Sequence, residues 1–332
     1  MSDAVGTIPY NPSIPNNTRM GTLADGTLRF IPTLWSSKIN KRFYATTVFG
    51  EISNSDYSGE ISGMGDKVVI MNSPLIDIGD YKIGDTLTYE RPAVDKVELT
   101  IDRAKKFSYQ INDVEKFQTK ADYVAEFADA SAMQLKVAID FDVLNSIYND
   151  PVAENKGNNA GAKSGDINLG AAGGTDGSKA LQLVSTSTVA NNQCNVFDLI
   201  TRLSATLDEQ NIPEEDRWLL VPPLFRTKLA QSSQAIALIQ GNDQTMYRNG
   251  KFGQIDRWTI YSTNQLKVVT EGTQKLTYIL AGHKSSLCFA SQISELESMK
   301  NPYDFGSLIR GLNVYGFKTI KPQAMAAAVV YF

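Results

Sequence analysis

The chain has 332 residues, and at roughly 150 residues per domain this length suggests about two packed units with enough apolar material for a substantial core. Lys and Arg total 32 and Asp and Glu total 36, and the resulting net charge of −4 argues against a protein that coats nucleic acid through its phosphates. No apolar run approaches the ~20 residues that cross a bilayer, and the N-terminus lacks the pattern of a secretory signal, so we expect a soluble protein made in the cytoplasm.

The N-terminal residues are polar and interrupted by proline. Residues 1–30 contain Pro9, Pro12 and Pro15, which predicts an extended arm without a core of its own. Residues 33–48 follow Pro32 and carry apolar side chains at helical spacing, which predicts a short helix.

The next segment, residues 67–111, has the alternating pattern of antiparallel β structure. Apolar side chains at Val97, Leu99 and Ile101 alternate with polar ones. Within this segment, residues 72–92 combine glycines and acidic residues with little apolar clustering, which predicts a long exposed hairpin.

The strongest helical pattern runs from Asn112, a suitable N-cap with Glu115 at position N3, to Asn149. It carries two apolar stripes, and residues 121 and 123, one from each stripe, lie about 200° apart at 100° per residue. The first stripe comprises Phe117, Ala121, Val124, Ala128, Ala132, Leu135, Ile139 and Val143, and the second comprises Tyr123, Phe127, Ala130, Met133, Val137, Phe141, Leu144 and Tyr148. Two apolar faces predict packing against the chain's own sheet on one side and against another element or subunit on the other. The alternative is a helix buried entirely within one subunit.

Residues 151–193 are crowded with Gly, Ala, Asn and Ser, which predicts an insertion or mobile loop that buries little apolar area. A second folded unit is expected from Val196, where an amphipathic helix precedes a strand at 218–221 and a helix that opens at Pro222. The remaining strand candidates are 275–280, 286–290, 309–315, 317–320 and 325–331, with Gly316 and Pro322 separating the last three. Clusters of helices and strands without strict alternation predict an α+β protein.

The sequence lacks the parts of common active sites. One histidine, His283, and two cysteines, Cys194 and Cys288, are too few for a structural zinc site, and neither a phosphate-binding loop nor a G-x-S-x-G motif is present. We expect His283 in a polar turn after a strand and the cysteines as small buried side chains. A hydrolase built around His283 is a minor alternative. We expect no catalytic residue, metal or cofactor.

The order of these elements resembles the major capsid proteins of tailed bacteriophages, which have the Hong Kong 97 type phage capsid fold. The resemblance covers most of the chain and rests on the joint order of several short segments. These segments are 30–36, 56–60, 65–68, 101–107, 221–223, 250–264, 281–284 and 310–316.

The resemblance implies an α+β phage capsid fold with an N-terminal arm, an extended hairpin loop, a peripheral domain with a long spine helix, and an axial domain. The implied division is 1–65 for the arm and short helix, 66–111 for the β structure with its hairpin, 112–150 with 296–332 for the peripheral domain, 151–195 for the insertion, and 196–295 for the axial domain.

The same resemblance implies an icosahedral shell of pentamers and hexamers that encloses double-stranded DNA, with only weak, non-specific contact to that DNA and no contact with a membrane. We therefore expect a virion protein that is assembled in the host cytoplasm together with a portal. No cleaved scaffolding domain precedes the arm, so a separate scaffolding protein is expected.

The hairpin and arm would then provide the contacts between subunits. The implied interface residues are Ile76, Asp80, Tyr81, Lys82, Asp85, Tyr89 and Arg91 in the hairpin, and Ile31 and Trp35 in the arm. Some relatives cross-link a hairpin lysine to an asparagine of a partner subunit. Lys82 stands in the hairpin, but we identify no matching Asn and catalytic Glu, so we do not infer this cross-link for the present chain. The alternative function is the shell of a cellular protein nanocompartment with the same fold.

Overall fold

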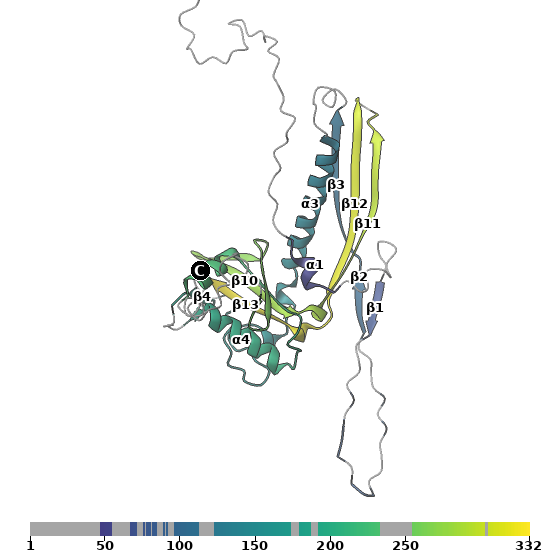
Figure 1. The fold of residues 1–332 in the computed structure, drawn as a ribbon. Coiled ribbons are helices and arrows are strands. Elements are labelled where there is room, and N and C mark those ends of the chain that lie inside the picture. Colours follow the sequence, from purple (N-terminus) through teal and green to yellow (C-terminus); the bar gives the residue numbers. More distant parts are fainter. Residues whose placement is uncertain are drawn as a thin grey trace, which may run out of the picture.

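We describe a computed structural model, and the residues it describes are 47–54, 67–71, 76, 78–80, 82–84, 89, 91, 96–112, 123–173, 179–186, 192–232, 254–302 and 305–332. Figure 1 shows a compact unit built on a mixed sheet, a long arm formed by a helix beside three strands, and a projecting two-stranded ribbon. The predicted combination of helices and sheets in an α+β protein is confirmed.

The compact unit is built on an eight-stranded mixed sheet. Its strand order is β5-β4-β13-β10-β6-β8-β7, and β9 also pairs with β10. The strands are β4 (Leu181–Val184), β5 (Gln193–Asn195), β6 (Arg217–Val221), β7 (Gln254–Ile255), β8 (Trp258–Ser262), β9 (Val268–Glu271), β10 (Gln274–His283) and β13 (Met325–Tyr331). The helices of this unit are α4 (Val196–Glu209) and α5 (Pro223–Gln231).

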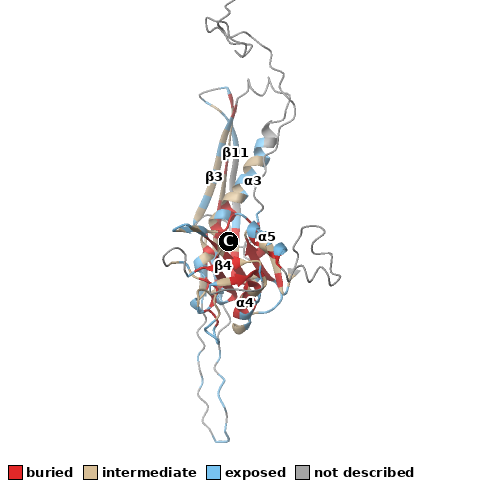
Figure 2. Cartoon of the chain, turned by 90° about the vertical axis from the view of Figure 1, so that its left-hand side faces the viewer, coloured by how far each residue is buried: buried red, intermediate tan, exposed pale blue. Residues whose placement is uncertain are grey.

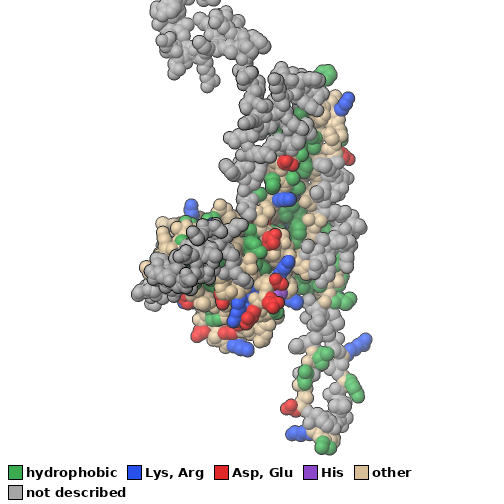
Figure 3. All heavy atoms as spheres, viewed as in Figure 1, with side chains coloured by type: hydrophobic (Ala, Val, Ile, Leu, Met, Phe, Trp, Pro, Cys, Tyr) green, Lys and Arg blue, Asp and Glu red, His purple; other side chains and the backbone are tan. Residues whose placement is uncertain are grey.

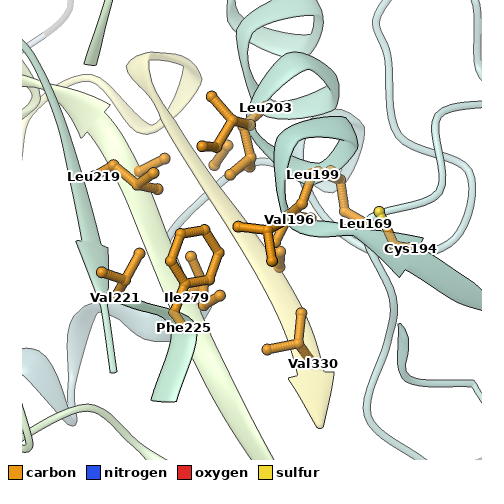
Figure 4. Close-up of a cluster of buried hydrophobic side chains, with 14 of the residues drawn as sticks. Leu169, Cys194, Val196, Leu199, Leu203, Leu219, Val221, Phe225, Ile279 and Val330 are labelled. Atoms are coloured by element: carbon orange, nitrogen blue, oxygen red, sulfur yellow. The ribbon is translucent and has the colours of Figure 1, made fainter. Parts of the chain in front are cut away.

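The central strands bury side chains on both faces of this sheet. In β6, Leu219 and Val221 pack with α4 in one core, whereas Trp218 and Leu220 point to the other face and join a second core with the spine helix. Figure 4 shows the first core, with Leu199 and Leu203 of α4 directed toward the strands. Helix α4 begins as predicted, because the side chain of Asn195 accepts a hydrogen bond from the Phe197 N–H.

The long arm consists of an antiparallel sheet in the order β11-β12-β3 with helix α3 beside β3. Its elements are β3 (Arg103–Asn112), α3 (Tyr123–Leu144), β11 (Leu287–Lys300) and β12 (Gly306–Thr319). Figure 2 shows that buried residues gather in the compact unit and at the base of the arm, whereas most of the upper arm is half-buried or exposed, with Ile111 near its far end an exception.

A two-stranded antiparallel ribbon, β1 (Lys67–Met71) with β2 (Lys96–Thr100), packs at the base of the arm. Val68, Ile70 and Leu99 of the ribbon share a core with Cys288 of β11 and Val314 of β12. The remaining elements are the short helix α1 (Phe49–Ile52) and the 3₁₀ turns η2 (Ile147–Asn149), η3 (Ala153–Asn155), η5 (Lys284–Ser286) and η6 (Pro322–Ala324). None of the helices in the described part of the chain is long and apolar enough to cross a bilayer.

The predicted start of the long helix is not tested, because residues 113–122 lie outside the described part of the chain. Asn112, the predicted N-cap, is the last residue of β3, where it pairs with Gly306. Helix α3 is described from Tyr123 to Leu144 and is followed by a 3₁₀ turn at 147–149. The predicted helix at 33–48 lies outside the described residues except for its last two positions, and the described helix α1 begins at Phe49.

The prediction that residues 151–195 form a loop of little buried area is also wrong. This segment contributes β4 and β5 to the main sheet, and its Leu169 and Leu183 are fully buried. Asn155 is fully buried too, and its side-chain amide donates to the carbonyls of Gln323 and Met325 at 2.6 and 2.8 Å. Polar side chains therefore hold this segment in place by hydrogen bonds to the backbone, a contribution that composition does not reveal.

Two predictions about the C-terminal strands also need correction. Strand β12 is continuous through Gly316, which was expected to separate two strands. Strand β13 lies in the eight-stranded sheet between β4 and β10, whereas 296–332 was grouped with the spine helix. The reason is its sequence of small apolar side chains, Ala326 to Val330, which are buried on both faces as in a central strand.

Candidate assembly surfaces

The connection between β1 and β2 carries large apolar side chains that its own subunit does not cover. The register places Met71 opposite Lys96, so residues 72–95 join the two strands. Exposures are 62% for Ile76, 91% for Ile78, 100% for Ile83 and 92% for Tyr89. We call these four residues the hairpin surface, and Figure 3 shows hydrophobic side chains on this projection.

Five of the nine predicted interface residues lie in the described part of the chain. Ile76, Asp80, Lys82, Tyr89 and Arg91 are exposed on the connection, as an interface in an assembly requires. Tyr81, Asp85, Ile31 and Trp35 lie outside the described residues. Ile78 and Ile83 were not among the predicted interface residues, although their side chains are 91% and 100% exposed. The available signal was an isoleucine on each side of the polar residues 79–82.

Helix α3 has one buried and one exposed apolar face. Leu135, Ile139 and Val143 of the first stripe pack into the core at the base of the arm. The second stripe is exposed at Phe127 (41%), Met133 (52%) and Phe141 (56%), half-buried at Ala130 and Val137, and buried at Leu144. The three exposed residues, the helix surface, fall within about 120° of the helix circumference. The alternative of a helix buried entirely within one subunit is therefore wrong.

A charged cluster joins α3 to the strands beside it. Asp142 of α3 accepts hydrogen bonds from Arg103 Nη1 of β3 at 2.7 Å and from the Tyr315 hydroxyl of β12 at 2.6 Å. Burial alone would raise the pKa of Asp142, but the hydrogen bonds from Tyr315 and Arg103 and the charge of Arg103 together hold this pKa below its ordinary value. The cluster fixes the helix on its sheet, and the exposed stripe is thereby held in a defined position.

The single histidine has a structural role in this fold. His283 ends β10, and its Nδ1 accepts a hydrogen bond from the Ser285 N–H at 3.1 Å, which caps the following 3₁₀ turn. Burial lowers the pKa of His283, which favours the neutral ring that this hydrogen bond requires. The expectation of a histidine in a polar turn after a strand is confirmed.

The cysteines are buried, as predicted, and are not paired with each other. Burial raises the pKa of Cys194 to about 12, so its thiol is not a nucleophile at neutral pH. Among the described residues, no three His, Cys, Asp or Glu side chains lie close enough to hold a metal ion.

An open groove of about 640 Å³ lies between the start of α5, the β9–β10 hairpin and the end of β13. Its wall includes Leu224, Val268 and Tyr331, and Lys275 is the one charged side chain among the residues that line it. A single lysine among apolar and neutral groups provides no pair for acid–base chemistry.

Comparisons with known proteins identify the fold. No protein-family model matches the chain, and no curated protein matches its sequence. Among solved structures, it is similar to a chain of Mycobacterium phage Che8, with a TM-score of 0.66 and 22% identity over 91% of this chain and 97% of that one. It is also similar to the capsid of cyanophage P-SCSP1u (TM-score 0.61, 18% identity, 98% and 99% covered) and to the capsid of a native GTA particle (0.56, 11%, 91% and 95%). The chain therefore has the phage capsid fold, and this prediction is confirmed.

Proposed function

We propose that this chain is a capsid shell protein, the major head protein of a tailed bacteriophage, with a structural and not a catalytic role. The observation that carries the proposal is the exposure of large apolar side chains on two elements, the β1–β2 connection and α3, in a chain with the phage capsid fold. Exposed apolar clusters of this kind are typical of surfaces that other chains cover.

The two surfaces suit contacts between copies of one chain. A closed shell needs heterologous contacts, in which one patch of a subunit meets a different patch of its neighbour. The hairpin surface lies on the connection between β1 and β2 and the helix surface lies on α3, so each subunit offers two distinct apolar patches. We propose that these contacts build pentamers and hexamers, and that the hairpin residues Ile76, Asp80, Lys82, Tyr89 and Arg91 take part in them.

The proposal extends to the domains of the subunit, its contact with DNA and its assembly partners. We assign the peripheral unit to α3 with β3, β11 and β12, and the axial unit to the eight-stranded sheet with α4 and α5. A net charge of −4 favours weak contact with the enclosed double-stranded DNA. We further propose a virion protein that is assembled in the host cytoplasm with a separate scaffolding protein and a portal.

The direct test is the assembly state of the purified full-length chain. We expect closed shells, or irregular shells and sheets in the absence of scaffold, by size-exclusion chromatography and negative-stain microscopy at micromolar concentration. A chain that stays monomeric alone, with its scaffolding protein and at high salt would overturn the proposal.

A matched pair of variants tests whether the hairpin surface is an assembly surface. Ile83→Asp places a charge on a fully exposed side chain of the connection, so the subunit should fold and shells should be lost. Ala205→Asp places the same charge on the exposed side of α4 and should leave shells intact. Shells of normal yield from Ile83→Asp would remove this residue from the interface.

A further inference from the structure

One carboxylate of the spine helix is buried and connects two parts of the chain that are far apart in sequence. Asp140 of α3 is 1% exposed, and its Oδ1 accepts hydrogen bonds from the backbone N–H groups of Val48 at 3.3 Å and Phe49 at 2.9 Å. Val48 is the N-cap of α1 and contributes no capping side chain of its own. Asp140 therefore does for α1 what a capping residue normally does locally.

Among the described residues, the carboxylate has no further hydrogen-bond partner: its Oδ2 is buried without a hydrogen bond. No charged neighbour shifts its pKa either, since the causes of that shift are burial and the two backbone hydrogen bonds. Near Asp140 on its own helix, the titratable residues are Lys136 and Asp142, and α1 carries Glu51. The core that α1 shares with α3 also contains the tyrosines Tyr148, Tyr261 and Tyr315. None of them forms a hydrogen bond with Asp140. Ionisation of a buried carboxylate without a cation costs free energy. The stability of the contact between Asp140 and residues 48 and 49 therefore depends on whether Asp140 is protonated.

The segment that Asp140 holds, residues 48–53, lies at the start of the described part of the chain. Phe49 and Ile52 are buried in the core at the base of the arm, and the Phe49 ring meets Phe289 edge to face at 4.7 Å. After α1, the Asn54 N–H donates to the Leu287 carbonyl and its carbonyl accepts from the Phe289 N–H. Residues 48–54 thus bridge α3 and β11, and the Asp140 contact lies at the N-terminal end of this bridge.

We propose that Asp140 is a proton-linked latch, which holds residues 48–53 on the spine helix more firmly when it is protonated than when it is ionised. The inference is independent of the proposed function, because it concerns a contact within one chain. Its consequence is that the attachment of the N-terminal segment to the spine helix depends on pH.

The surroundings of the Asp140 carboxylate determine whether docking of residues 48–53 is favoured at low or at high pH. Burial raises the pKa of Asp140 above its ordinary value of 3.8, and the two backbone hydrogen bonds offset this only in part. When residues 48–53 separate from α3, the carboxylate meets water and its pKa returns toward the ordinary value. The docked state therefore binds the proton more tightly, and opening becomes easier as pH rises from 3.8 to the raised value.

Hydrogen exchange of the full-length chain measures this opening. Amides of residues 48–53, corrected for intrinsic exchange, should show an opening constant that rises with pH over this window by up to about tenfold per pH unit, the limit for one proton. Amides of α4 in the same samples serve as the internal reference. The assembly state is checked at each pH.

The variant Asp140→Asn keeps an acceptor for Phe49 N–H but removes the titration, so the pH dependence at 48–53 should vanish. Glu51→Gln is the matched control on α1 and should retain the wild-type profile. An unchanged slope in Asp140→Asn, or a flat profile in the wild type, would overturn the proposal. If Asp140→Asn does not fold, the pH profiles of the wild type and of Glu51→Gln are compared instead. A pH dependence at 48–53 that Glu51→Gln retains supports the proposal, and one that Glu51→Gln abolishes would overturn it.

Discussion

Two carboxylates on the spine helix, two residues apart, show how strongly the surroundings of a side chain determine its chemistry. Asp140 is buried without a cation, and its pKa is raised. Asp142 lies between Arg103 and Tyr315, and its pKa is lowered despite partial burial. Sequence alone does not separate them, because the partners of Asp142 come from strands about 40 and 170 residues away.

The Asp142 cluster gives a prediction about stability and pH. Tyr315→Phe removes the hydroxyl that donates to Asp142 and should lower the free energy of unfolding by about 1–2 kcal/mol at pH 7. The lowered pKa of Asp142 means that this stabilisation is present above pH 3.8 and is lost as pH falls through the lowered value. Urea titration of the unassembled subunit at several pH values measures the difference.

The control for this prediction is Tyr331→Phe, since the Tyr331 hydroxyl makes no hydrogen bond to any described residue. It should change stability by no more than about 0.5 kcal/mol. A loss from Tyr315→Phe that stays constant down to pH 2.5 would show that the hydroxyl does not act through the Asp142 charge.

Among the helices and strands, those whose formation depends on nearby residues were predicted correctly from the sequence. Helix α4 has a side-chain N-cap and one apolar face, and the buried strand β6 has a continuous apolar run, so both were found. Strand β4 was missed, because it is short and lies among glycines whose role is set by distant contacts. Gly170, for example, has a φ of +77°, and a Cβ there would lie 2.3 Å from the Val329 carbonyl of β13.

Strand β12 provides a prediction at this scale. A Cβ at Gly316 would lie 2.3 Å from the carbonyl oxygen of Thr100, so the glycine lets β12 pass close to the end of β2. Gly316→Ala must displace backbone and should destabilise the subunit by about 3 kcal/mol, the upper part of the usual range for overpacking. Gly79→Ala, where a Cβ meets nothing within 4 Å, should have no measurable effect on the thermal midpoint. Equal midpoints for the two variants would contradict this account of Gly316.

The two faces of α3 give a second prediction. Val143 is fully buried, so Val143→Asp places an unpaired carboxylate in the core and should yield insoluble protein. Phe141 is 56% exposed, so Phe141→Asp should give a soluble, folded subunit that fails to assemble. Lys136→Gln on the exposed polar side should cost about 0.5 kcal/mol or less and leave assembly intact. Solubility, circular dichroism and microscopy separate these outcomes, and insoluble protein from Phe141→Asp would mean that this face belongs to the subunit core.

At the scale of the whole molecule, order of elements was more informative than any motif. The arm, long hairpin, spine helix and returning strands suggested the phage capsid fold, which the structural similarity confirms. Which residues are available to a neighbour depends on the packed structure, because only there does it become clear that Met133 and Phe141 of the second stripe of α3 are exposed. Ile78 and Ile83 were missed for the same reason, since isolated isoleucines in a polar segment do not form a periodic pattern.

The last prediction separates folding of the subunit from its assembly. Within residues 79–88, Ile83 is 100% exposed, and Gly79, Asp80, Lys82 and Gly84 are exposed too, so the described part of this range contributes almost no buried area to its own subunit. Deletion of residues 79–88 should therefore leave the thermal unfolding midpoint within a few degrees of the wild type, while shell formation or maturation is lost. The ribbon should still form, because Lys67 pairs with Glu98 at 3.1 Å and Val68, Ile70 and Leu99 remain buried against β11 and β12. A deletion that unfolds the subunit would show that the connection supports the core, and normal shells from it would show that residues 79–88, Ile83 among them, are not needed for assembly.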